Sequence, residues 1–243
     1  FERVDPLEEP IPIRPTCHYT MGGIDVVDYR TAATAVHGVF AAGEAACVSI
    51  HGANRLGGNS LADIMVFGRI AGLGASECAH QRSFGGEEQL NKAVQAWKSK
   101  FAEVTARKVG PTVPELRDRM AETMWYKVGI FRNATDLENA RREINCLIND
   151  YEKNCVIGDS SKVFNTAFVN YIELGNLLTM AKAVVLGATN RKESRGCHLR
   201  DDYTKRDDEN FLKHSIITLE GSEYKLSWRP VVVTKYQPAE RRY

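Results

Sequence analysis

The stretch Ala41-Ala-Gly-Glu-Ala-Ala-Cys-Val-Ser-Ile-His-Gly-Ala-Asn-Arg-Leu-Gly-Gly-Asn-Ser-Leu61 decides the fold of the first part of the chain. The preceding segment Gly38-Val-Phe-Ala-Ala is apolar on both faces, which predicts a short buried strand. A glycine-rich loop then leads into an apolar helix. The stretch thus places a carboxylate, an arginine and a helix N-terminus close together, a combination that suits anionic ligands.

Glu44 is the carboxylate, and it directly follows the predicted strand. A carboxylate at the carboxyl end of a strand is the usual partner of the ribose hydroxyls of an adenine dinucleotide. The alternative is an ordinary loop carboxylate.

The start of the predicted helix is the second candidate contact. Gly57 and Gly58 let a ligand approach the backbone, and Asn59 or Ser60 is the expected N-cap. The unpaired backbone N–H groups of Ser60 and Leu61 would stabilise the negative charge of a reduced flavin. The alternative is a plain capped helix after a turn.

Arg55 and His18 are candidate ligands for a substrate carboxylate. Arg55 lies among glycines just before the helix, and a guanidinium binds a carboxylate through two parallel hydrogen bonds. His18 precedes the pair Gly22-Gly23 and can donate to a carboxylate. The alternatives are a surface arginine and a structural histidine, and we interpret His51 as structural.

The remainder of the chain predicts helices and then irregular structure. Four apolar stripes at helical spacing predict an antiparallel bundle over residues 86–188, and they indicate core packing rather than a cofactor pocket. The predicted fold class is an α/β segment over residues 1–80 that carries the candidate flavin-binding contacts, the antiparallel helical bundle, and a small irregular C-terminal region over residues 189–243. A β-hairpin is expected there, with its turn at Gly221-Ser222.

Composition excludes several classes of function. The net charge of +1 in 243 residues gives no reason to expect nucleic acid. The six cysteines are scattered without a Cys-x-x-Cys pair, which argues against a metal site and favours a reduced compartment. We expect no apolar run of the roughly 18 residues that span a bilayer, so membrane association would come through a partner.

Several motifs together resemble the flavoprotein subunit of succinate dehydrogenase and fumarate reductase. They are His18-Tyr-Thr-Met-Gly-Gly, Gly43-Glu44, His51-Gly-Ala-Asn-Arg-Leu-Gly-Gly-Asn-Ser-Leu61, Phe67-Gly-Arg, Arg191-Lys-Glu-Ser-Arg-Gly-Cys-His and Arg206-Asp-Asp-Glu-Asn-Phe-Leu-Lys-His214. The resemblance extends to Lys235-Tyr-Gln-Pro-Ala-Glu-Arg-Arg-Tyr at the end, so it covers essentially the whole chain.

The resemblance implies a cofactor, a reaction and partners. It implies FAD, contacted by Gly43, Glu44, Asn59, Ser60 and Leu61, and a dicarboxylate held by His18 and Arg55. It implies hydride transfer between flavin N5 and succinate or fumarate, with electrons passing to an iron–sulfur subunit and to membrane anchor subunits with quinone. The implied location is the cytoplasmic face of the inner membrane, or the mitochondrial matrix face, through those partners.

Two features of the chain depart from the family pattern. The family's upstream FAD fingerprint, flavin-linking histidine and capping domain have no counterpart here, so we expect roughly the C-terminal two-fifths of a longer subunit, inactive alone. Cys197 and Thr204 stand where the family usually has alanine and proline, and we expect both to lie away from the substrate site.

Two rival functions remain. L-aspartate oxidase shares His51-Gly-Ala-Asn-Arg-Leu, although the run Arg206–His214 favours the succinate and fumarate family. A non-catalytic half of a split flavoprotein is the other alternative.

Overall fold

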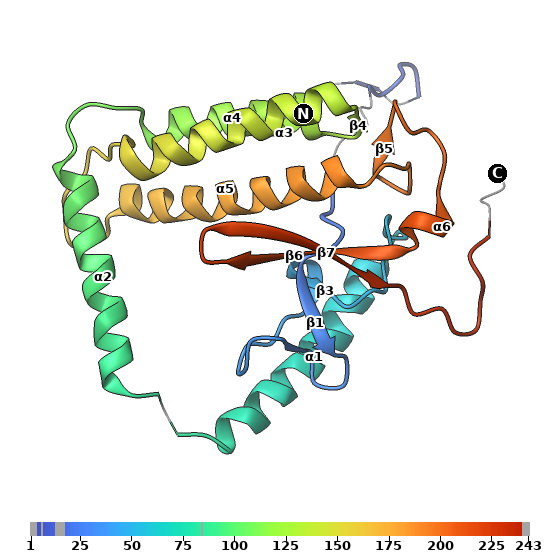
Figure 1. The fold of residues 1–243 in the computed structure, drawn as a ribbon, viewed down its shortest axis with the longest axis horizontal. Coiled ribbons are helices and arrows are strands. Elements are labelled where there is room, and N and C mark those ends of the chain that lie inside the picture. The colour runs from blue at the N-terminus through green and yellow to red at the C-terminus, as the bar shows by residue number, and fades with distance from the viewer. Residues whose placement is uncertain (1–3, 6, 13–17, 84, 240–243) are drawn as a thin grey trace.

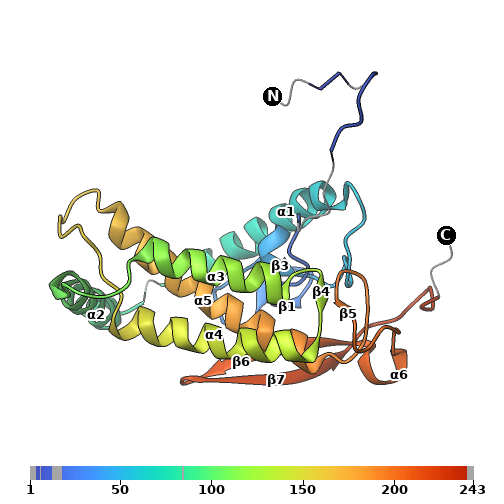
Figure 2. The ribbon, with the colours of Figure 1, turned by 90° about the horizontal axis from the view of Figure 1, so that it is seen from above.

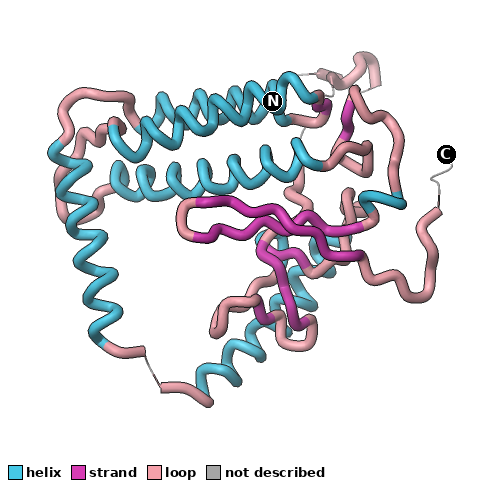
Figure 3. Tube along the Cα trace, in the orientation of Figure 1, coloured by secondary structure: helices cyan, strands magenta, loops and turns pink. Residues whose placement is uncertain are grey.

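The computed structural model describes residues 4–5, 7–12, 18–83 and 85–239 (Figure 1). Long helices lie side by side in the upper part of this view, a further helix runs down its left side, a small sheet and a long helix form the lower part, and a β-hairpin runs between the upper and lower parts (Figures 1 and 3). In chain order the elements are β1 (Ile24–Asp28), β2 (Ala33–Thr34), the short 3₁₀ helix η1 (Gly43–Ala45), β3 (Ala46–Cys47), α1 (Asn59–His80), α2 (Glu87–Ala106), α3 (Val113–Val128), β4 (Phe131–Arg132), α4 (Ala134–Lys153), α5 (Thr166–Asn190), β5 (Leu199–Arg200), α6 (Asp208–Phe211), β6 (Lys213–Glu220) and β7 (Glu223–Pro230).

Helices α3, α4 and α5 pack side by side as an antiparallel bundle, and their shared interior is the main hydrophobic core (Figure 2). The predicted stripes of these helices recur at intervals of three or four residues and supply that interior. Its buried members include Leu116, Met120, Leu137, Ile144, Leu147, Tyr171, Leu174, Leu178 and Val185. The structure therefore confirms core packing for these stripes.

Side chains fix where the bundle helices begin. Thr112 Oγ1 accepts from the Glu115 N–H at 3.4 Å, and Glu115 Oε2 accepts from the Thr112 N–H at 2.7 Å. Asn133 and Asn165 cap α4 and α5 through their amide oxygens. These bonds satisfy first-turn N–H groups that have no partner within the helix.

Helix α5 differs from the expectation that no segment is long and apolar enough to span a bilayer. Among the described residues it is the one helix long and apolar enough to cross a membrane, with a mean hydropathy of 1.2. Its packing accounts for part of this composition, because α5 contacts α3, α4, β6 and β7, although only 28% of the apolar window is buried. A central helix carries apolar residues on more than one side.

The first half of α2 does not join the bundle core, contrary to the prediction. Leu90 and Val94 are exposed, whereas Val104 near the helix end is completely buried. Trp97, midway along the helix, is half-exposed and meets the Phe168 ring edge-on at 6.4 Å between centroids. Near the helix end, the Phe101 ring meets the Phe168 ring edge-on at 4.8 Å between centroids. Helix α2 is therefore attached to the bundle by its last turns.

The predicted strand over residues 38–42 is wrong. Strand β1 pairs antiparallel with β2 and parallel with β3, and in the described chain Phe40 makes only an isolated bridge, to Ala33. The Thr34 N–H donates to the Val39 carbonyl at 3.0 Å, so the segment folds back onto β2 through a tight turn. It is thereby held beside the sheet without becoming a regular strand.

The carboxylate of Glu193 organises the region after α5. Its side chain is completely buried, and it accepts from Arg191 at 2.7 Å, from Arg195 at 2.8 and 2.9 Å, and from the Asp207 N–H at 2.9 Å. Burial raises the pKa of this carboxyl, but the bonds from Arg195, Asp207 and Arg191 outweigh it and hold the pKa below its usual value.

His198 and Arg132 join the end of the bundle to the same region. His198 Nε2–H donates to the Arg191 carbonyl at 2.9 Å, and its Nδ1 accepts from Arg132 Nη1 at 2.7 Å. Burial, with the nearby Arg132 and Arg200 charges, lowers the pKa of His198 to about 4, so the ring is neutral at pH 7. Strands β4 and β5 pair in parallel beside it.

The C-terminal hairpin forms as predicted. Strands β6 and β7 pair antiparallel from Lys213 and Pro230 to Glu220 and Glu223, and they are joined by the two-residue turn at Gly221-Ser222. Gly221 has φ of 64°, the left-handed conformation that such a tight turn requires. The division of the chain into three domains at residues 80–86 and 188–189 stays a prediction.

We expect Gly175→Ala in α5 to destabilise the bundle. A β-carbon at position 175 would lie 2.4 Å from the Tyr151 hydroxyl oxygen and 2.7 Å from Cζ, so the stacked Tyr151 ring must move. Overpacking of this kind costs about 1–3 kcal/mol in the free energy of unfolding. Thermal unfolding measures it. Gly187→Ala in the same helix is the control, because its β-carbon would meet Ile217 at an ordinary 3.6 Å. Equal stability of the two variants would contradict the packing argument.

We expect Glu193→Gln to lower the free energy of unfolding at pH 7 by roughly 3 kcal/mol, because it removes the charge that Arg191 and Arg195 surround. The folded-state pKa of Glu193 is depressed, so its contribution is fully present above the unfolded-state pKa of about 4.3 and is lost as the pH falls through the folded value. Urea denaturation at pH 7 and in acid should therefore show the difference between wild type and variant shrinking in acid. Glu223→Gln, at the exposed hairpin turn, is the control.

Candidate functional site

Glu44 lies on η1, immediately before β3, rather than at the end of a strand as predicted. Its side chain is exposed, and Oε1 accepts from the Thr20 N–H at 2.9 Å. Gly43 holds η1 against α1: its φ is 70°, and a β-carbon would lie 3.0 Å from the Ile64 side chain. Gly43 therefore sets how closely the Glu44 turn approaches the helix.

The N-terminus of α1 differs in detail from the prediction. The N-cap is Gly58, with φ of 81°, and Asn59 is already the first helical residue. Neither Asn59 nor Ser60 caps the helix with its side chain, because only glycine adopts this left-handed entry without strain.

Of the two N–H groups predicted to face a flavin, that of Leu61 donates to the Gly58 carbonyl at 3.1 Å. The Ser60 N–H has no acceptor among the described residues. Ser60 is therefore the stronger candidate donor of the two. The helix also presents apolar side chains there, because Leu61, Ile64 and Met65 are exposed.

Arg55 lies against the neighbour of His18. Its guanidinium carbon is 4.6 Å from the centroid of the Tyr19 ring, and Nη1 donates to the Leu56 carbonyl at 3.0 Å. Its Nε is buried without a partner in the described chain. His18 itself is exposed and makes no hydrogen bond with the described residues. The structure thus links the two predicted carboxylate ligands through Tyr19 rather than by direct contact.

His51 is structural in its contacts, as interpreted from the sequence. Its Nε2–H donates to Asp63 Oδ2 at 3.0 Å, and the Asp63 side chain is almost completely buried on the second turn of α1. The pair fixes the loop that carries Arg55 to the helix that begins beside it.

The C-terminal region holds this loop from the other side. His214 of β6 is hydrogen-bonded to Ser49 at 2.9 Å, and Arg229 of β7 donates two bonds to the Asp25 carboxylate at 2.6 and 2.7 Å. Ser49 has φ of 66°, an uncommon conformation for a residue with a side chain, and the His214 bond helps to hold it. The hairpin therefore contacts both β1 and the loop before His51.

Cys197 lies close to the Arg55 loop, whereas we expected it to lie away from the substrate site. Its backbone N–H donates to the carbonyl of Ala53, two residues before Arg55, at 3.0 Å. The Cys197 thiol reaches the same carbonyl at 2.9 Å. The adjacent Gly196 has φ of 58°, and a β-carbon there would lie 2.4 Å from that oxygen. The turn at Gly196-Cys197 therefore supports the Arg55 loop.

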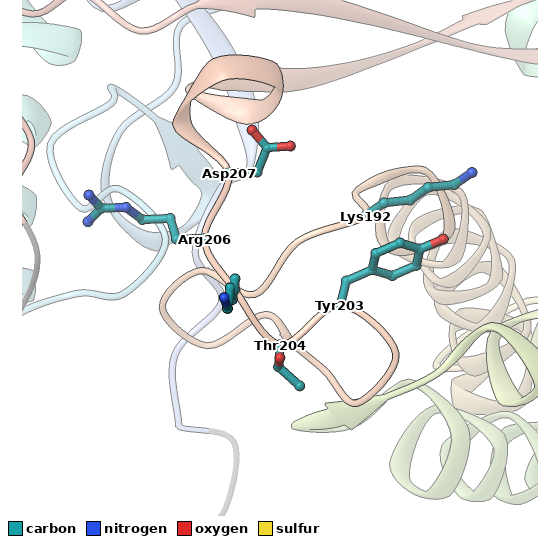
Figure 4. Close-up of a pocket in the computed structure, with 6 residues that line it drawn as sticks. Lys192, Tyr203, Thr204, Arg206 and Asp207 are labelled. Atoms are coloured by element: carbon teal, nitrogen blue, oxygen red, sulfur yellow. The ribbon is translucent and has the colours of Figure 1, made fainter.

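A separate hollow of about 340 Å³ lies in the C-terminal region, lined by Lys192, Tyr203, Thr204, Lys205, Arg206 and Asp207 (Figure 4). The Lys192 and Tyr203 side chains extend to one side and Arg206 to the other. Arg206 is also paired with Asp208 at 2.9 Å. The positive groups do not converge, and none of the predicted site residues lines this hollow. In the described chain no group of three or more His, Cys, Asp or Glu side chains is placed to hold a metal ion.

Tyr19 and Asp63 are the residues that sequence analysis missed. Neighbouring side chains in extended backbone face opposite ways. An exposed His18 therefore implies that the adjacent Tyr19 faces the protein, and Tyr19 is half-buried. For Asp63, one acidic residue inside an apolar helix stripe was the available signal, because a buried carboxylate requires a partner.

Comparisons with known proteins agree with this architecture. Residues 117–243 match the family model described as the C-terminal part of the fumarate reductase flavoprotein, and residues 1–61 match an FAD binding domain model. The second match indicates FAD as the cofactor, and it includes Gly43, Glu44, Arg55 and the start of α1.

Named relatives cover the whole chain. It is 47% identical over 245 residues to the 8-methylmenaquinol:fumarate reductase flavoprotein subunit of Wolinella succinogenes, covering all of this chain and 40% of that protein. It is 40% identical over 247 residues to the succinate dehydrogenase flavoprotein subunit of Rickettsia conorii, covering 96% of this chain and 40% of that protein.

A solved fumarate reductase structure has the same fold as this chain. A variant of Escherichia coli quinol fumarate reductase FrdA superposes with a TM-score of 0.89 at 38% identity, covering 98% of this chain and 40% of that chain. The chain thus spans about two-fifths of the length of these relatives, which are oxidoreductases. It belongs to the succinate dehydrogenase and fumarate reductase flavoprotein family.

Proposed function

We propose that this chain is part of an FAD-containing subunit that interconverts succinate and fumarate. The observation that carries the proposal is the unpartnered, buried Nε of Arg55, a few residues before the free Ser60 N–H at the start of α1. Buried donors without partners are rare in native structures and point to an anionic group that completes the site.

The residues present fit FAD. The exposed Glu44 carboxylate would bind ribose hydroxyls, and Gly43 lets its turn lie close to α1. The start of α1 at Asn59, Ser60 and Leu61 would face the flavin ring, with the Ser60 N–H as the free donor. When bound, FAD supplies a site that accepts or releases a hydride at N5.

His18 and Arg55 would hold the dicarboxylate. Arg55 offers a planar fork of donors that matches one carboxylate, and the exposed His18 would donate to the other. Fixing both ends of a four-carbon diacid orients its central carbons toward the flavin, which lowers the entropic part of the barrier.

The same proposal assigns partners and location. The resemblance implies that electrons pass to an iron–sulfur subunit and then to membrane anchor subunits that bind quinone, and the quinols in the names of the relatives support the quinone end of this path. The subunit would lie on the cytoplasmic face of the inner membrane, or on the matrix face in mitochondria, held by those partners.

The direct test is substrate oxidation by the holoenzyme. We expect succinate to reduce the bound flavin and fumarate to reoxidise it, with no reaction of L-aspartate. Flavin reduction by L-aspartate alone would support the L-aspartate oxidase alternative, and a protein that binds no flavin would leave only a scaffolding role.

Arg55→Ala should lower kcat/KM for succinate by at least about 100-fold, because it removes two charge-assisted hydrogen bonds to a carboxylate. FAD content should stay at the wild-type level. The matched control is Arg141→Ala, which removes an exposed arginine paired with Glu138 at 2.7 Å and should leave turnover unchanged. Near-normal turnover of Arg55→Ala would exclude the proposed role.

Ser60→Pro should lower the reduction potential of the flavin, because it removes the backbone N–H that would stabilise the reduced, negatively charged ring. Proline is compatible with this position of a helix, since α3 carries Pro114 at its own second residue. Ser60→Ala keeps the N–H and is the control. Spectroscopic redox titration measures the effect, and identical potentials for the two variants would refute the contact.

A further inference from the structure

Four buried side-chain polar atoms lie in one cluster beside the Arg55 loop, and none of them makes a hydrogen bond of normal geometry in the described chain. They are Tyr19 Oη, His51 Nδ1, Arg55 Nε and Asp63 Oδ1. Burial and the neighbouring Asp63 carboxylate raise the pKa of Tyr19, so the Tyr19 hydroxyl faces Asp63. Native proteins rarely leave such groups unpaired unless the site has a function that uses them. The cluster is therefore a candidate for supporting Arg55. The proposed contact of Arg55 with substrate does not explain why Tyr19, His51 and Asp63 are arranged beside it.

The four side chains form a continuous series of contacts that starts on α1. Asp63 accepts from His51 at 3.0 Å, and the His51 ring meets the Tyr19 ring edge-on at 5.4 Å and 85°. The series ends at Arg55, whose guanidinium carbon lies 4.6 Å from the Tyr19 ring centroid. Each member thus limits the movement of the next, from the helix to the guanidinium.

Stacking on an aromatic ring suits an arginine that must bind a carboxylate. A guanidinium is attracted to the face of a tyrosine ring, whereas its hydrogen-bond donors lie in its own plane. Tyr19 therefore holds one face of Arg55 without using a donor. Nη1 already donates to the Leu56 carbonyl, so the edge formed by Nε and Nη2 is the one available for a bidentate contact.

Tyr19 is also the residue next to His18. Tyr19 is half-buried and His18 is exposed, as expected for neighbours whose side chains point in opposite directions. The half-buried Tyr19 ring therefore restrains both the backbone that carries His18 and, through space, the guanidinium of Arg55.

We propose that Tyr19 is the positioning residue that sets the spacing between His18 and Arg55, with the His51–Asp63 pair as its support. This inference rests on the proposed function, because the spacing between His18 and Arg55 matters only if the two residues hold the two carboxylates of one substrate. Tyr19 does not touch the substrate: it acts through the two residues that do.

The test compares Tyr19→Leu with Tyr19→Phe in the FAD-loaded holoenzyme. Malonate, a non-reacting dicarboxylate, is the probe in calorimetric binding, and KM and kcat for succinate are measured in parallel. We expect Tyr19→Leu to raise the malonate Kd and the succinate KM about tenfold, with a smaller change in kcat, because it removes the aromatic face. Tyr19→Phe keeps that face and should bind malonate within about twofold of wild type.

A further variant shows whether weaker malonate binding comes from the charge distribution of the Tyr19 ring or from disturbed packing. Replacing Tyr19 with pentafluorophenylalanine keeps the shape of phenylalanine but reverses the charge distribution of the ring face. We expect it to weaken malonate binding relative to Tyr19→Phe at unchanged FAD content. Tyr126→Leu, at an exposed tyrosine of α3, is the control for the loss of a tyrosine and should bind malonate normally.

The outcomes distinguish this inference from the proposed function. If Arg55→Ala weakens malonate binding and all three Tyr19 variants bind normally, the positioning role is overturned and the proposed function stands. If the wild-type holoenzyme binds neither malonate nor succinate, the proposed function fails and the positioning role fails with it.

Discussion

The buried carboxylate of Glu193 is the constraint on which the arrangement of the C-terminal region depends. An isolated charge at this depth would be strongly destabilising, so Glu193 remains ionised only while Arg191 and Arg195 surround it. Arg191 in turn donates to the Lys213 carbonyl at 2.6 Å, at the first residue of β6. The position of the hairpin relative to α5 is thus set by the requirement to neutralise one charge.

The ion pairs of Glu193 also help to support the candidate site. Arg195 is followed directly by Gly196 and Cys197, whose turn contacts the Ala53 carbonyl. The Arg55 loop is therefore supported by residues distant in sequence on one side and by the His51–Asp63 pair on the other. A rigid scaffold of this kind is what substrate-positioning groups require, since small displacements of such groups are costly in rate.

Local patterns predicted much of this structure, and distant pairings account for the errors. The bundle stripes and the Gly221-Ser222 turn depend on residues a few positions apart, so periodicity and turn chemistry were sufficient. Residues 38–42 look like a strand by composition, but pairing depends on which neighbour the fold provides. The contacts of Ser49 with His214 and of Cys197 with Ala53 left no local signal. In the candidate site, Arg55 and Ser60 were proposed from neighbouring glycines and helix geometry, whereas the contact of Tyr19 with the Arg55 guanidinium is evident only from the structure.

The contact between Asp25 and Arg229 has a consequence for synthesis of the chain. The two residues are 204 positions apart, and ribosomes add roughly 5–20 residues per second, so β1 waits about 10–40 s before its partner emerges. During that interval β1 can already pair with β2 and β3, but Asp25 lacks its arginine. Strand β7 therefore completes the contacts of β1, and a nascent chain that stops before β7 leaves Asp25 without its arginine.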